Sequence, residues 1–384
     1  MNTRAVMQVL VRCRTDEPII VSPGNSGTVL SNLGHRAPTL YNTSLAYAAP
    51  SCFGLALARP DLKVIAIEGD GSLIAGLGFV TTLARYPIKN FVLLVIDNGR
   101  YFSTGRGIIK TATGATSKLE AIAKGAGIKN VVTATTVGEF EDQFVRAQQS
   151  DGPWVIVAKV ERSERALGKK DLDRPDRTEA AQIFRRWFTE HPCPPGKKVS
   201  VGKMGIEIDD KEHQSESSNA AIIYRAIKNA GINLVVYLPD SVTYPVQELA
   251  ELDPEMPTLC CAREDEGIAI AMGAYQGGLC PAIVTEGSGV GYCGLALALC
   301  MIYRTPLLIV SSHSVSLGVR FDHDTTSRLT NEPILRALQI PYEILRRIED
   351  APALIRESVH SMLVLKQPVG LVIPPYVMSD RGLN

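Results

Sequence analysis

Short runs of consecutive apolar, mostly β-branched residues constrain the fold of this chain more than any other feature. They occur at 18–21, 64–68, 91–97 and 154–159 in the first half, and at 234–238, 281–285, 306–311 and 370–373 in the second half. Amphipathic segments separate them. Continuous apolar strands are typical of parallel sheets that helices cover on both faces. The pattern therefore predicts an α/β fold with two domains, each a mainly parallel sheet flanked by helices.

A polar stretch from 163 to about 218 lies between these halves. Its segment 178–191 has the pattern of a terminal helix of the first domain, and the remainder is typical of a linker. We therefore expect one domain at 1–191, a linker at 192–217 and a second domain at 218–384.

The balance of charge limits the partners of this chain. It has 40 basic and 40 acidic residues, whereas a nucleic-acid or anionic-membrane partner requires an excess of basic charge. The 8 cysteines lack C-x-x-C spacing, and the N-terminus lacks the pattern of a secretory signal peptide. No apolar run reaches the length that spans a bilayer. We therefore expect a reduced, cytoplasmic protein that binds neither nucleic acid nor a membrane.

The most informative segment begins with a predicted strand at 62–68, which leads into the turn Gly-Asp-Gly-Ser at 69–72. A helix is expected at about 73–85, and a second strand, 91–96, comes shortly before Asn98. The two strand ends of such a βαβ unit meet at one edge of the sheet. A helix N-terminus that glycines open offers free N–H groups to a phosphate. The turn contains no lysine and no G-x-G-x-x-G pattern, so it is neither a Walker P-loop nor a dinucleotide site.

Oxygen ligands for a magnesium ion occur at the same edge. Asp70 supplies a carboxylate oxygen, Asn98 an amide oxygen, and the backbone near Arg100 a carbonyl oxygen. Mg²⁺ prefers such ligands and completes its octahedron with phosphate oxygens and water. Asp70 and Asn98 are 28 positions apart, which resembles the thiamine-diphosphate motif, where Asn follows Gly-Asp-Gly after slightly under thirty residues. For the Gly-Asp-Gly alone, an ordinary strand-to-helix turn is the alternative.

A second segment resembles phosphonopyruvate and sulfopyruvate decarboxylases. The stretch 42–51 is similar to their Gly-Ser-Met-Gly stretch, where the Met packs beneath the cofactor and forces its two rings into a V shape. Leu45 occupies the Met position, and an ordinary core leucine is the alternative. Thr43 and Ala46 stand in place of the two glycines.

The second half resembles the pyrimidine-binding domain of the same enzymes. Tyr-Leu-Pro-Asp-Ser at 237–241 is similar to their Val-Pro-Asp-Ser segment, and Ser-Gly-Val-Gly at 288–291 to a loop that follows a strand. These enzymes belong to the thiamine-diphosphate-dependent 2-oxo-acid decarboxylases. In single-chain members this domain normally comes first, whereas here it comes second. The two domains can also be separate subunits in this subfamily, so a fusion in reversed order is physically reasonable.

The resemblance implies two thiamine-diphosphate-binding-fold domains, with thiamine diphosphate and Mg²⁺ as cofactors. It places a carboxylic acid beside the aminopyrimidine, where the acid favours the imino tautomer. An ungapped count assigns this role to Glu264, and Glu266 and Asp265 remain alternatives. The residues expected at the cofactor are Gly24, Asn25, Ser44, Leu45, Gly69, Asp70, Gly71, Ser72, Asn98, Tyr101, Glu264 and Gly289. The expected metal ligands are Asp70, Asn98 and the carbonyl of Arg100.

His313 ends a predicted strand at the edge where ligands usually bind, and it is the second candidate catalytic residue. Arg320, Arg106 and His323 are candidates for binding an anionic group of the substrate. A structural role is the alternative for each. The family usually has Asn after the Ser-Gly-x-Gly loop, and here Tyr292 takes its place, which leaves the exact substrate open.

The expected function is therefore a non-oxidative decarboxylation that depends on thiamine diphosphate and Mg²⁺. Its substrate would be a short 2-oxo acid with a second anionic group, of the phosphonopyruvate or sulfopyruvate type, and its products an aldehyde and CO₂. The resemblance implies a homodimer or homotetramer with active sites at the subunit interface. A carboligase of the acetolactate-synthase type is the alternative. A non-catalytic cofactor-binding protein is the third reading, against which Asp70, Asn98 and an acid at 264–266 argue together.

Overall fold

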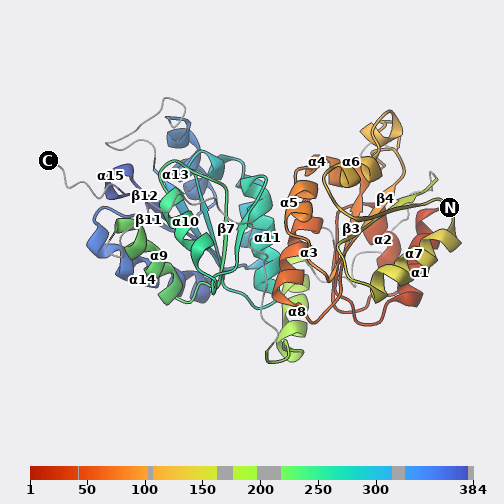
Figure 1. Ribbon diagram of the computed structural model, residues 1–384, viewed down its shortest axis with the longest axis horizontal. Helices are drawn as coiled ribbons and strands as arrows, with labels where there is room; N and C mark the ends of the chain where they lie inside the picture. Colours follow the sequence, from red (N-terminus) through yellow and green to blue (C-terminus); the bar gives the residue numbers. More distant parts are fainter. Residues whose placement is uncertain (42, 103–106, 162–175, 197–217, 314–324, 379–384) are drawn as a thin grey trace. The chain divides into compact units, whose positions relative to one another are not determined.

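The computed structural model describes residues 1–41, 43–102, 107–161, 176–196, 218–313 and 325–378. The chain divides into two compact units, Met1–Val199 and Ser200–Asn384, drawn in red to yellow-green and in green to blue in Figure 1. Most of the expected linker, 197–217, lies outside the described residues. The domain limits taken from the sequence therefore stay a prediction.

The first unit is built on a six-stranded sheet in which every neighbouring pair of strands is parallel. Its strands are β1 (Ile19–Val21), β2 (Thr39–Leu40), β3 (Val64–Gly69), β4 (Phe91–Asp97), β5 (Asn130–Ala134) and β6 (Trp154–Lys159), in the spatial order β2-β1-β3-β4-β6-β5. The four apolar runs predicted as strands are β1, β3, β4 and β6. Sequence analysis missed β2, which has two residues, and the edge strand β5, whose side chains are only partly buried.

Helices cover both faces of this sheet. They are α1 (Thr3–Cys13), α2 (Asn25–Asn32), α3 (Ala48–Ala58), α4 (Asp70–Ala75), α5 (Phe79–Arg85), α6 (Leu119–Gly125), α7 (Val137–Gln149) and α8 (Arg177–Glu190). One face packs against α1, α2 and α7, and the other against α3 and α5 (Figure 1). The terminal helix expected at 178–191 is α8.

The single helix expected at about 73–85 is wrong, because the chain forms the two helices α4 and α5 with a break at Gly76–Gly78. The break follows from a close approach of two backbone segments. A β-carbon at Gly76 would lie 2.7 Å from the Cβ of Ala46, so only glycine lets the turn before α3 pack here.

The second unit repeats this architecture. Its strands are β7 (Leu234–Tyr237), β8 (Thr258–Cys260), β9 (Pro281–Thr285), β10 (Leu307–Ser312), β11 (Tyr342–Ile344) and β12 (Pro368–Ile373). Their spatial order is β11-β12-β10-β9-β7-β8, and all neighbouring pairs are parallel. Counted from the start of its own unit, each sheet therefore has the strand order 2-1-3-4-6-5. The short strands β8 and β11 were not predicted from the sequence.

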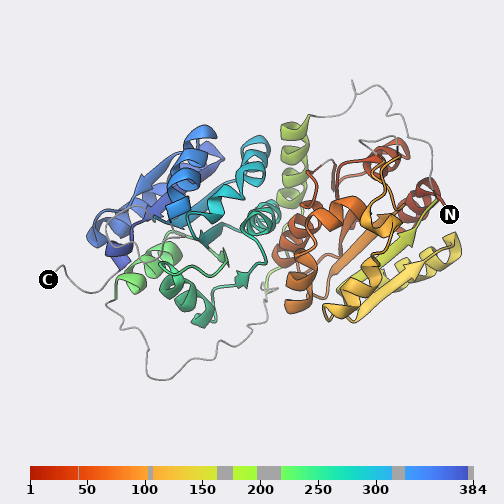
Figure 2. The same ribbon diagram turned by 90° about the horizontal axis from the view of Figure 1, so that it is seen from above.

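The helices of the second unit also form two layers. They are α9 (Asn219–Asn229), α10 (Tyr244–Leu252), α11 (Glu264–Gln276), α12 (Gly294–Tyr303), α13 (Ser327–Ala337), α14 (Ala351–Leu365) and α15 (Pro375–Met378). One face of the sheet shares its core with α9, α10 and α14, and α11 packs on β7 and β9 from the other face, as the two views show (Figures 1 and 2). The predicted class, two α/β domains with parallel sheets flanked by helices, is confirmed.

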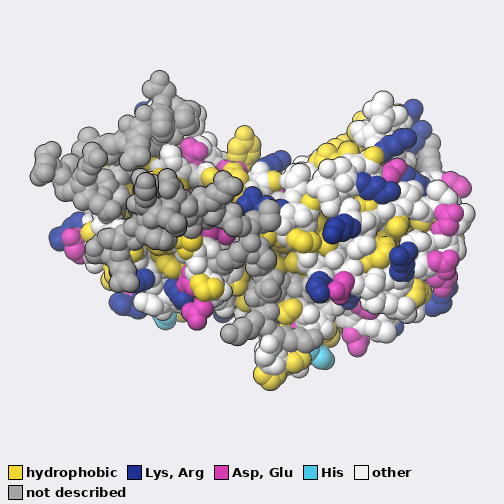
Figure 3. Space-filling model, in the orientation of Figure 1, with side chains coloured by type: hydrophobic (Ala, Val, Ile, Leu, Met, Phe, Trp, Pro, Cys, Tyr) yellow, Lys and Arg dark blue, Asp and Glu magenta, His cyan; other side chains and the backbone are white. Residues whose placement is uncertain are grey.

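The remaining global features agree with the composition. Basic and acidic side chains both occur on the face of the first unit that Figure 3 shows, in keeping with the balanced charge. Within the described ranges, no helix is long and apolar enough to cross a bilayer. All cysteines are free thiols.

Candidate active site

A pocket lies at the carboxyl edge of the first sheet, where the chain leaves β1, β3 and β4. Because β1 and β3 are the strands at which the winding of the sheet reverses, this is the edge position where α/β folds usually bind ligands. Most of the residues predicted to bind the cofactor or metal line it: Gly24, Asn25, Leu45, Gly69, Asp70, Gly71, Ser72, Asn98, Arg100 and Tyr101. Ser44 is half-buried and does not line this pocket. Leu45 is 50% exposed, which rules out the alternative of a core leucine.

The backbone around this pocket suits a phosphate group. Gly24 is the N-cap of α2 and has φ 133°, a conformation that favours glycine, and it has no side chain to occupy the first N–H groups of the helix. A β-carbon at Gly71 would lie 2.6 Å from the ring of Tyr101, so glycine lets this ring approach the turn. The pocket therefore offers backbone N–H groups of the kind that bind a phosphate.

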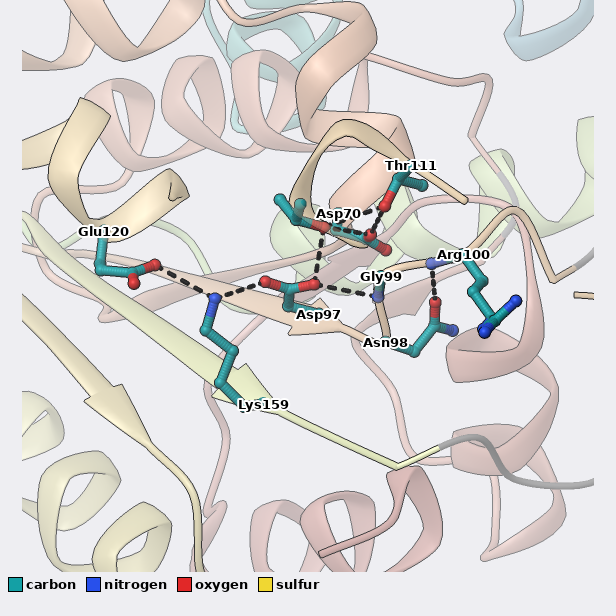
Figure 4. A network of polar contacts seen from close by, with 9 residues as sticks. Asp70, Asp97, Asn98, Gly99, Arg100, Thr111, Glu120 and Lys159 are labelled. Atoms are coloured by element: carbon teal, nitrogen blue, oxygen red, sulfur yellow. Dashed lines mark hydrogen bonds and ion pairs between the residues drawn. The ribbon is translucent and has the colours of Figure 1, made fainter. Parts of the chain in front are cut away.

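Asp70 is buried and held by two threonine hydroxyls (Figure 4). Thr111 Oγ1 donates to Asp70 Oδ2 over 2.5 Å, and Thr113 Oγ1 lies 2.8 Å from the same oxygen. Burial raises the pKa of Asp70, the two hydroxyls oppose this, and the charge of Asp97 raises it further. Both hydroxyls contact Oδ2, so neither of them occupies Oδ1.

Thr113 connects Asp70 to a second carboxylate. Its Oγ1 lies 2.8 Å from Asp97 Oδ1, which also accepts a hydrogen bond from the N–H of Gly99 (3.1 Å). Lys159 Nζ forms ion pairs with Asp97 Oδ2 (2.7 Å) and with Glu120 (3.2 Å), as Figure 4 shows. Asp97 is thereby paired with a cation beside the pocket.

The segment 111–114 closes over the turn that carries Asn98. Thr111 N–H donates to the carbonyl of Gly99 (3.0 Å), and Gly99, with φ 67°, would place a β-carbon 2.9 Å from Gly114 Cα. Asn98 Oδ1 accepts from the N–H of Arg100 (2.8 Å), which fixes the other side of the turn. Sequence analysis missed Thr111, Thr113 and Lys159, since no spacing rule links them to the motif and the sheet alone brings them there.

These residues fit a magnesium ion. The described residues contain no group of three or more His, Cys, Asp or Glu side chains that could hold a metal. The predicted set does not require one, because it combines the carboxylate of Asp70 with the neutral oxygens of Asn98 and the Arg100 backbone. All three residues line the same pocket, and an amide oxygen that accepts one hydrogen bond keeps a second lone pair.

Glu68, the residue before the Gly-Asp-Gly turn, is fully buried on the face of the sheet that α3 covers. Its Oε1 accepts a hydrogen bond from the N–H of Ala49, at the start of α3 (2.9 Å). Burial raises the pKa of Glu68 to about 7, although the hydroxyl of Ser72 and the N–H of Ala49 oppose the shift. Glu68 therefore joins the strand that carries the motif to the helix that follows Leu45.

In the second unit, the three acids at the start of α11 have different surroundings. Asp265 forms a two-bond ion pair with Arg263 (3.0 and 2.7 Å), and Glu266 accepts a hydrogen bond from the N–H of Ala262 (3.4 Å). Glu264 is buried, and the backbone N–H of its own residue donates a hydrogen bond to its carboxylate. Burial raises the pKa of Glu264.

The carboxylate of Glu264 lies against the backbone of Gly289. A β-carbon at Gly289 would lie 2.6 Å from Glu264 Cδ, so glycine at this position lets the Glu264 side chain lie where it does. The structure thus brings together Glu264 and Gly289, which are 25 positions apart and were both predicted at the cofactor. This geometry favours Glu264 over Asp265 and Glu266, because Glu264 lies against the predicted cofactor loop and Asp265 is paired with Arg263.

His313 follows β10 at the carboxyl edge of the second sheet, as predicted. Its Nε2 lies 3.1 Å from Glu332 Oε1, and Tyr342 donates to the other oxygen of Glu332 (2.7 Å). The imidazole is thereby oriented by an acid from α13. The substrate candidates Arg106, Arg320 and His323 lie outside the described residues.

Comparisons with known proteins give a consistent picture. Residues 27–158 match the family described as thiamine pyrophosphate enzyme, C-terminal TPP binding domain. Sulfopyruvate decarboxylase subunit beta of Methanocaldococcus jannaschii is 37% identical over 153 residues, which are 37% of this chain and 79% of that protein. The alpha subunit of Methanothermobacter thermautotrophicus is 32% identical over 145 residues, 38% of this chain and 84% of that protein. Phosphonopyruvate decarboxylase of Streptomyces viridochromogenes is 29% identical over 201 residues, 52% of this chain and 49% of that protein.

Solved structures with little sequence identity share the fold. Transketolase from Campylobacter jejuni superposes with a TM-score of 0.59 at 13% identity, over 96% of this chain and 73% of that one. Benzoylformate decarboxylase from Polynucleobacter necessarius gives a TM-score of 0.57 at 10% identity, over 97% of this chain and 98% of that one. The predicted thiamine-diphosphate-binding fold of the two units is therefore confirmed.

Replacing Thr113 with valine removes the hydroxyl between Asp70 and Asp97 while keeping the shape of the side chain. We expect Thr113→Val to lower the free energy of unfolding by about 1–3 kcal/mol, because the buried carboxylates of Asp70 and Asp97 lose the polar hydroxyl that lies between them. Urea denaturation measures this loss, with the exposed Thr116→Val as the control. Equal stability of the two variants would contradict a structural role for the Thr113 hydroxyl.

Glu68 predicts a pH dependence of stability. Because the folded protein binds the Glu68 proton more tightly than the unfolded chain, stability falls as pH rises from about 4.5 to about 7 and then levels off. The loss is on the order of 3 kcal/mol. We expect Glu68→Gln to reduce this slope in denaturation series at several pH values, whereas Glu190→Gln, at an exposed position, keeps it. An unchanged slope in Glu68→Gln would count against the assignment.

Proposed function

This chain belongs to the thiamine-pyrophosphate-dependent 2-oxo-acid decarboxylases, and we propose that it removes CO₂ from a short 2-oxo acid with a second anionic group. Sulfopyruvate and phosphonopyruvate, which occur in the names of its relatives, are acids of this type. The observation that carries the proposal is the pairing of two half-sites in one chain. One is the pocket around Asp70 and Asn98, and the other is the buried carboxylate of Glu264 beside Gly289.

The residues of the first unit have the roles of a diphosphate and metal site in this proposal. Asp70, Asn98 and the carbonyl of Arg100 would hold Mg²⁺, and the N–H groups after Gly24 and in the turn 69–72 would receive phosphate oxygens. Leu45, exposed at the pocket, would pack against the cofactor. When bound, thiamine diphosphate supplies the electron sink that accepts the charge left behind by departing CO₂.

Glu264 has the role of the acid that shares a proton with the aminopyrimidine. Burial raises the pKa of its carboxyl, which suits a group that must both gain and lose a proton. Asp265 is held by Arg263, so it is less suited to this exchange. His313, oriented by Glu332, would serve as a second proton carrier at the same edge of the sheet.

The subunit composition of the relatives supports a proposal about assembly. Both the alpha and the beta subunits of sulfopyruvate decarboxylases match this chain, each over about two fifths of its length. We therefore propose that one chain combines the roles of the two subunits, in domains at 1–191 and 218–384. Two or four copies would assemble with active sites at their interfaces, as the resemblance implies.

A calorimetric titration tests the cofactor site. We expect the protein to bind thiamine diphosphate only with Mg²⁺, and Asp70→Ala to weaken this binding by at least about tenfold, because the metal loses its carboxylate ligand. Asp151→Ala, at an exposed ion pair, should bind as the unchanged protein does. Failure of the unchanged protein to bind with Mg²⁺ present would overturn the proposal.

CO₂ release from a panel of 2-oxo acids then identifies the substrate class. We expect release from sulfopyruvate or phosphonopyruvate to be about tenfold or more faster than from pyruvate, because a second anionic group adds a charge-assisted hydrogen bond. Formation of a longer 2-hydroxy-3-oxo acid instead of an aldehyde would favour the carboligase.

Replacing Glu264 with glutamine tests the acid. We expect Glu264→Gln to bind the cofactor but to release CO₂ more slowly by about a hundredfold or more, because the amide cannot transfer a proton. Glu266→Gln, two residues along the same helix, is the matched control and should keep most of its activity. An equal loss in both variants would contradict the assignment of Glu264.

A further inference from the structure

Asp240, from the Leu-Pro-Asp-Ser segment after β7, has no role in the proposed function, yet it is 5% exposed at the carboxyl edge of the second sheet. Its Oδ2 accepts hydrogen bonds from both the N–H (2.8 Å) and the hydroxyl (2.6 Å) of Thr243. Its Oδ1 accepts a hydrogen bond from the hydroxyl of Ser312 (3.3 Å). A single buried carboxylate therefore joins the end of β7 to the end of β10.

Ser312 extends this connection to a third strand. It is the last residue of β10, and its Oγ accepts a hydrogen bond from the N–H of Gly287 (3.1 Å), just after β9. Because the Ser312 hydroxyl gives its proton to Asp240, its lone pairs face Gly287. A β-carbon at Gly287 would meet the carbonyl of Ser312 and lie 2.8 Å from Asn331 Nδ2, so the approach is close. Asp240 thus sets the direction of both hydrogen bonds.

Gly287 opens the loop that lies against the candidate acid. Two residues later, Gly289 touches the carboxylate of Glu264, with no room for a β-carbon between them. On the opposite side, Thr330 Oγ1 lies 3.4 Å from the carbonyl of Gly287, and a β-carbon at Gly291 would lie 2.9 Å from Thr330 Cβ. The loop 287–291 therefore packs against Thr330 on one side and against the carboxylate of Glu264 on the other.

We propose that Asp240 is a positioning residue, which acts through Ser312 and the loop 287–289 to fix the carboxylate of Glu264. It touches neither substrate nor cofactor in this role. The inference rests on the proposed function, since it assigns to Asp240 the orientation of the acid that works there. A different role, in which Asp240 only caps the turn into α10, requires the bonds to Thr243 but not the bond to Ser312.

Variants that change the two sides of the Asp240 carboxylate separate these roles, since Ser312 contacts Oδ1 and Thr243 contacts Oδ2. Asp240→Asn keeps one acceptor oxygen for Thr243 but presents an amide N–H to Ser312, which reverses that hydrogen bond. Ser312→Ala removes the acceptor for Gly287. Thr243→Val is the matched control, since it deletes a hydroxyl from the same carboxylate on the side away from the loop.

The measurement is the rate at which bound thiamine diphosphate exchanges its C2 proton for solvent deuterium, followed by NMR after acid quench. This rate reports the action of Glu264 without turnover. We expect it to fall between about tenfold and a hundredfold in Asp240→Asn and Ser312→Ala, because a small displacement of the acid misaligns proton transfer. The dissociation constant of the cofactor should stay within about twofold. Thr243→Val should keep the rate of the unchanged protein while its thermal unfolding temperature falls.

Three results overturn the inference. Wild-type exchange rates in Asp240→Asn and Ser312→Ala would show that the loop does not depend on Asp240. A fall in Thr243→Val as large as in Asp240→Asn, in proportion to lost thermal stability, would leave only the capping role. If the unchanged protein binds no cofactor, the proposed function fails and the inference fails with it. If it binds and exchanges normally and the variants match it, the inference alone fails.

Discussion

The burial of both faces of each parallel sheet is the constraint on which the rest of this structure depends. Strands such as β4 and β10 are apolar except at their carboxyl ends, where Asp97 and the pair Ser311 and Ser312 lie. Parallel pairing brings these ends to one edge. Every candidate residue of the described chain, from Asp70 to Glu264, therefore lies in or next to a loop at such an edge. The chemistry is concentrated there because the sheet excludes it elsewhere.

The polar groups at these edges hold one another in place. In the first unit, Thr113 joins Asp70 to Asp97, and in the second unit Ser312 joins Asp240 to Gly287. In both cases a hydroxyl stands between a carboxylate and the end of another strand. Since an unsatisfied buried carboxylate would cost several kcal/mol, each of these hydroxyls stabilises the fold as well as the site.

The sequence predicted what depends on local pattern. Uninterrupted apolar runs indicated the central strands, and the spacing of Asp70 and Asn98 indicated two residues that line one pocket. Features that depend on distant packing were not predictable in this way. The helix break at Gly76 arises from contact with Ala46, and Thr113 reaches Asp70 only because residues 107–114 fold back over the sheet edge. The partly exposed strand β5 lacks the continuous apolar pattern that identified its neighbours.

The presence of both units in one chain has a consequence for the ratio in which the two units are made. Where the two domains are separate polypeptides, the cell must make them in equal amounts, and dilution lowers the fraction that is assembled. In this chain a covalent connection fixes their ratio at one to one. It also keeps each half at a high effective concentration with respect to the other, whatever the expression level. The ratio of the two units therefore does not depend on how much of the chain the cell makes.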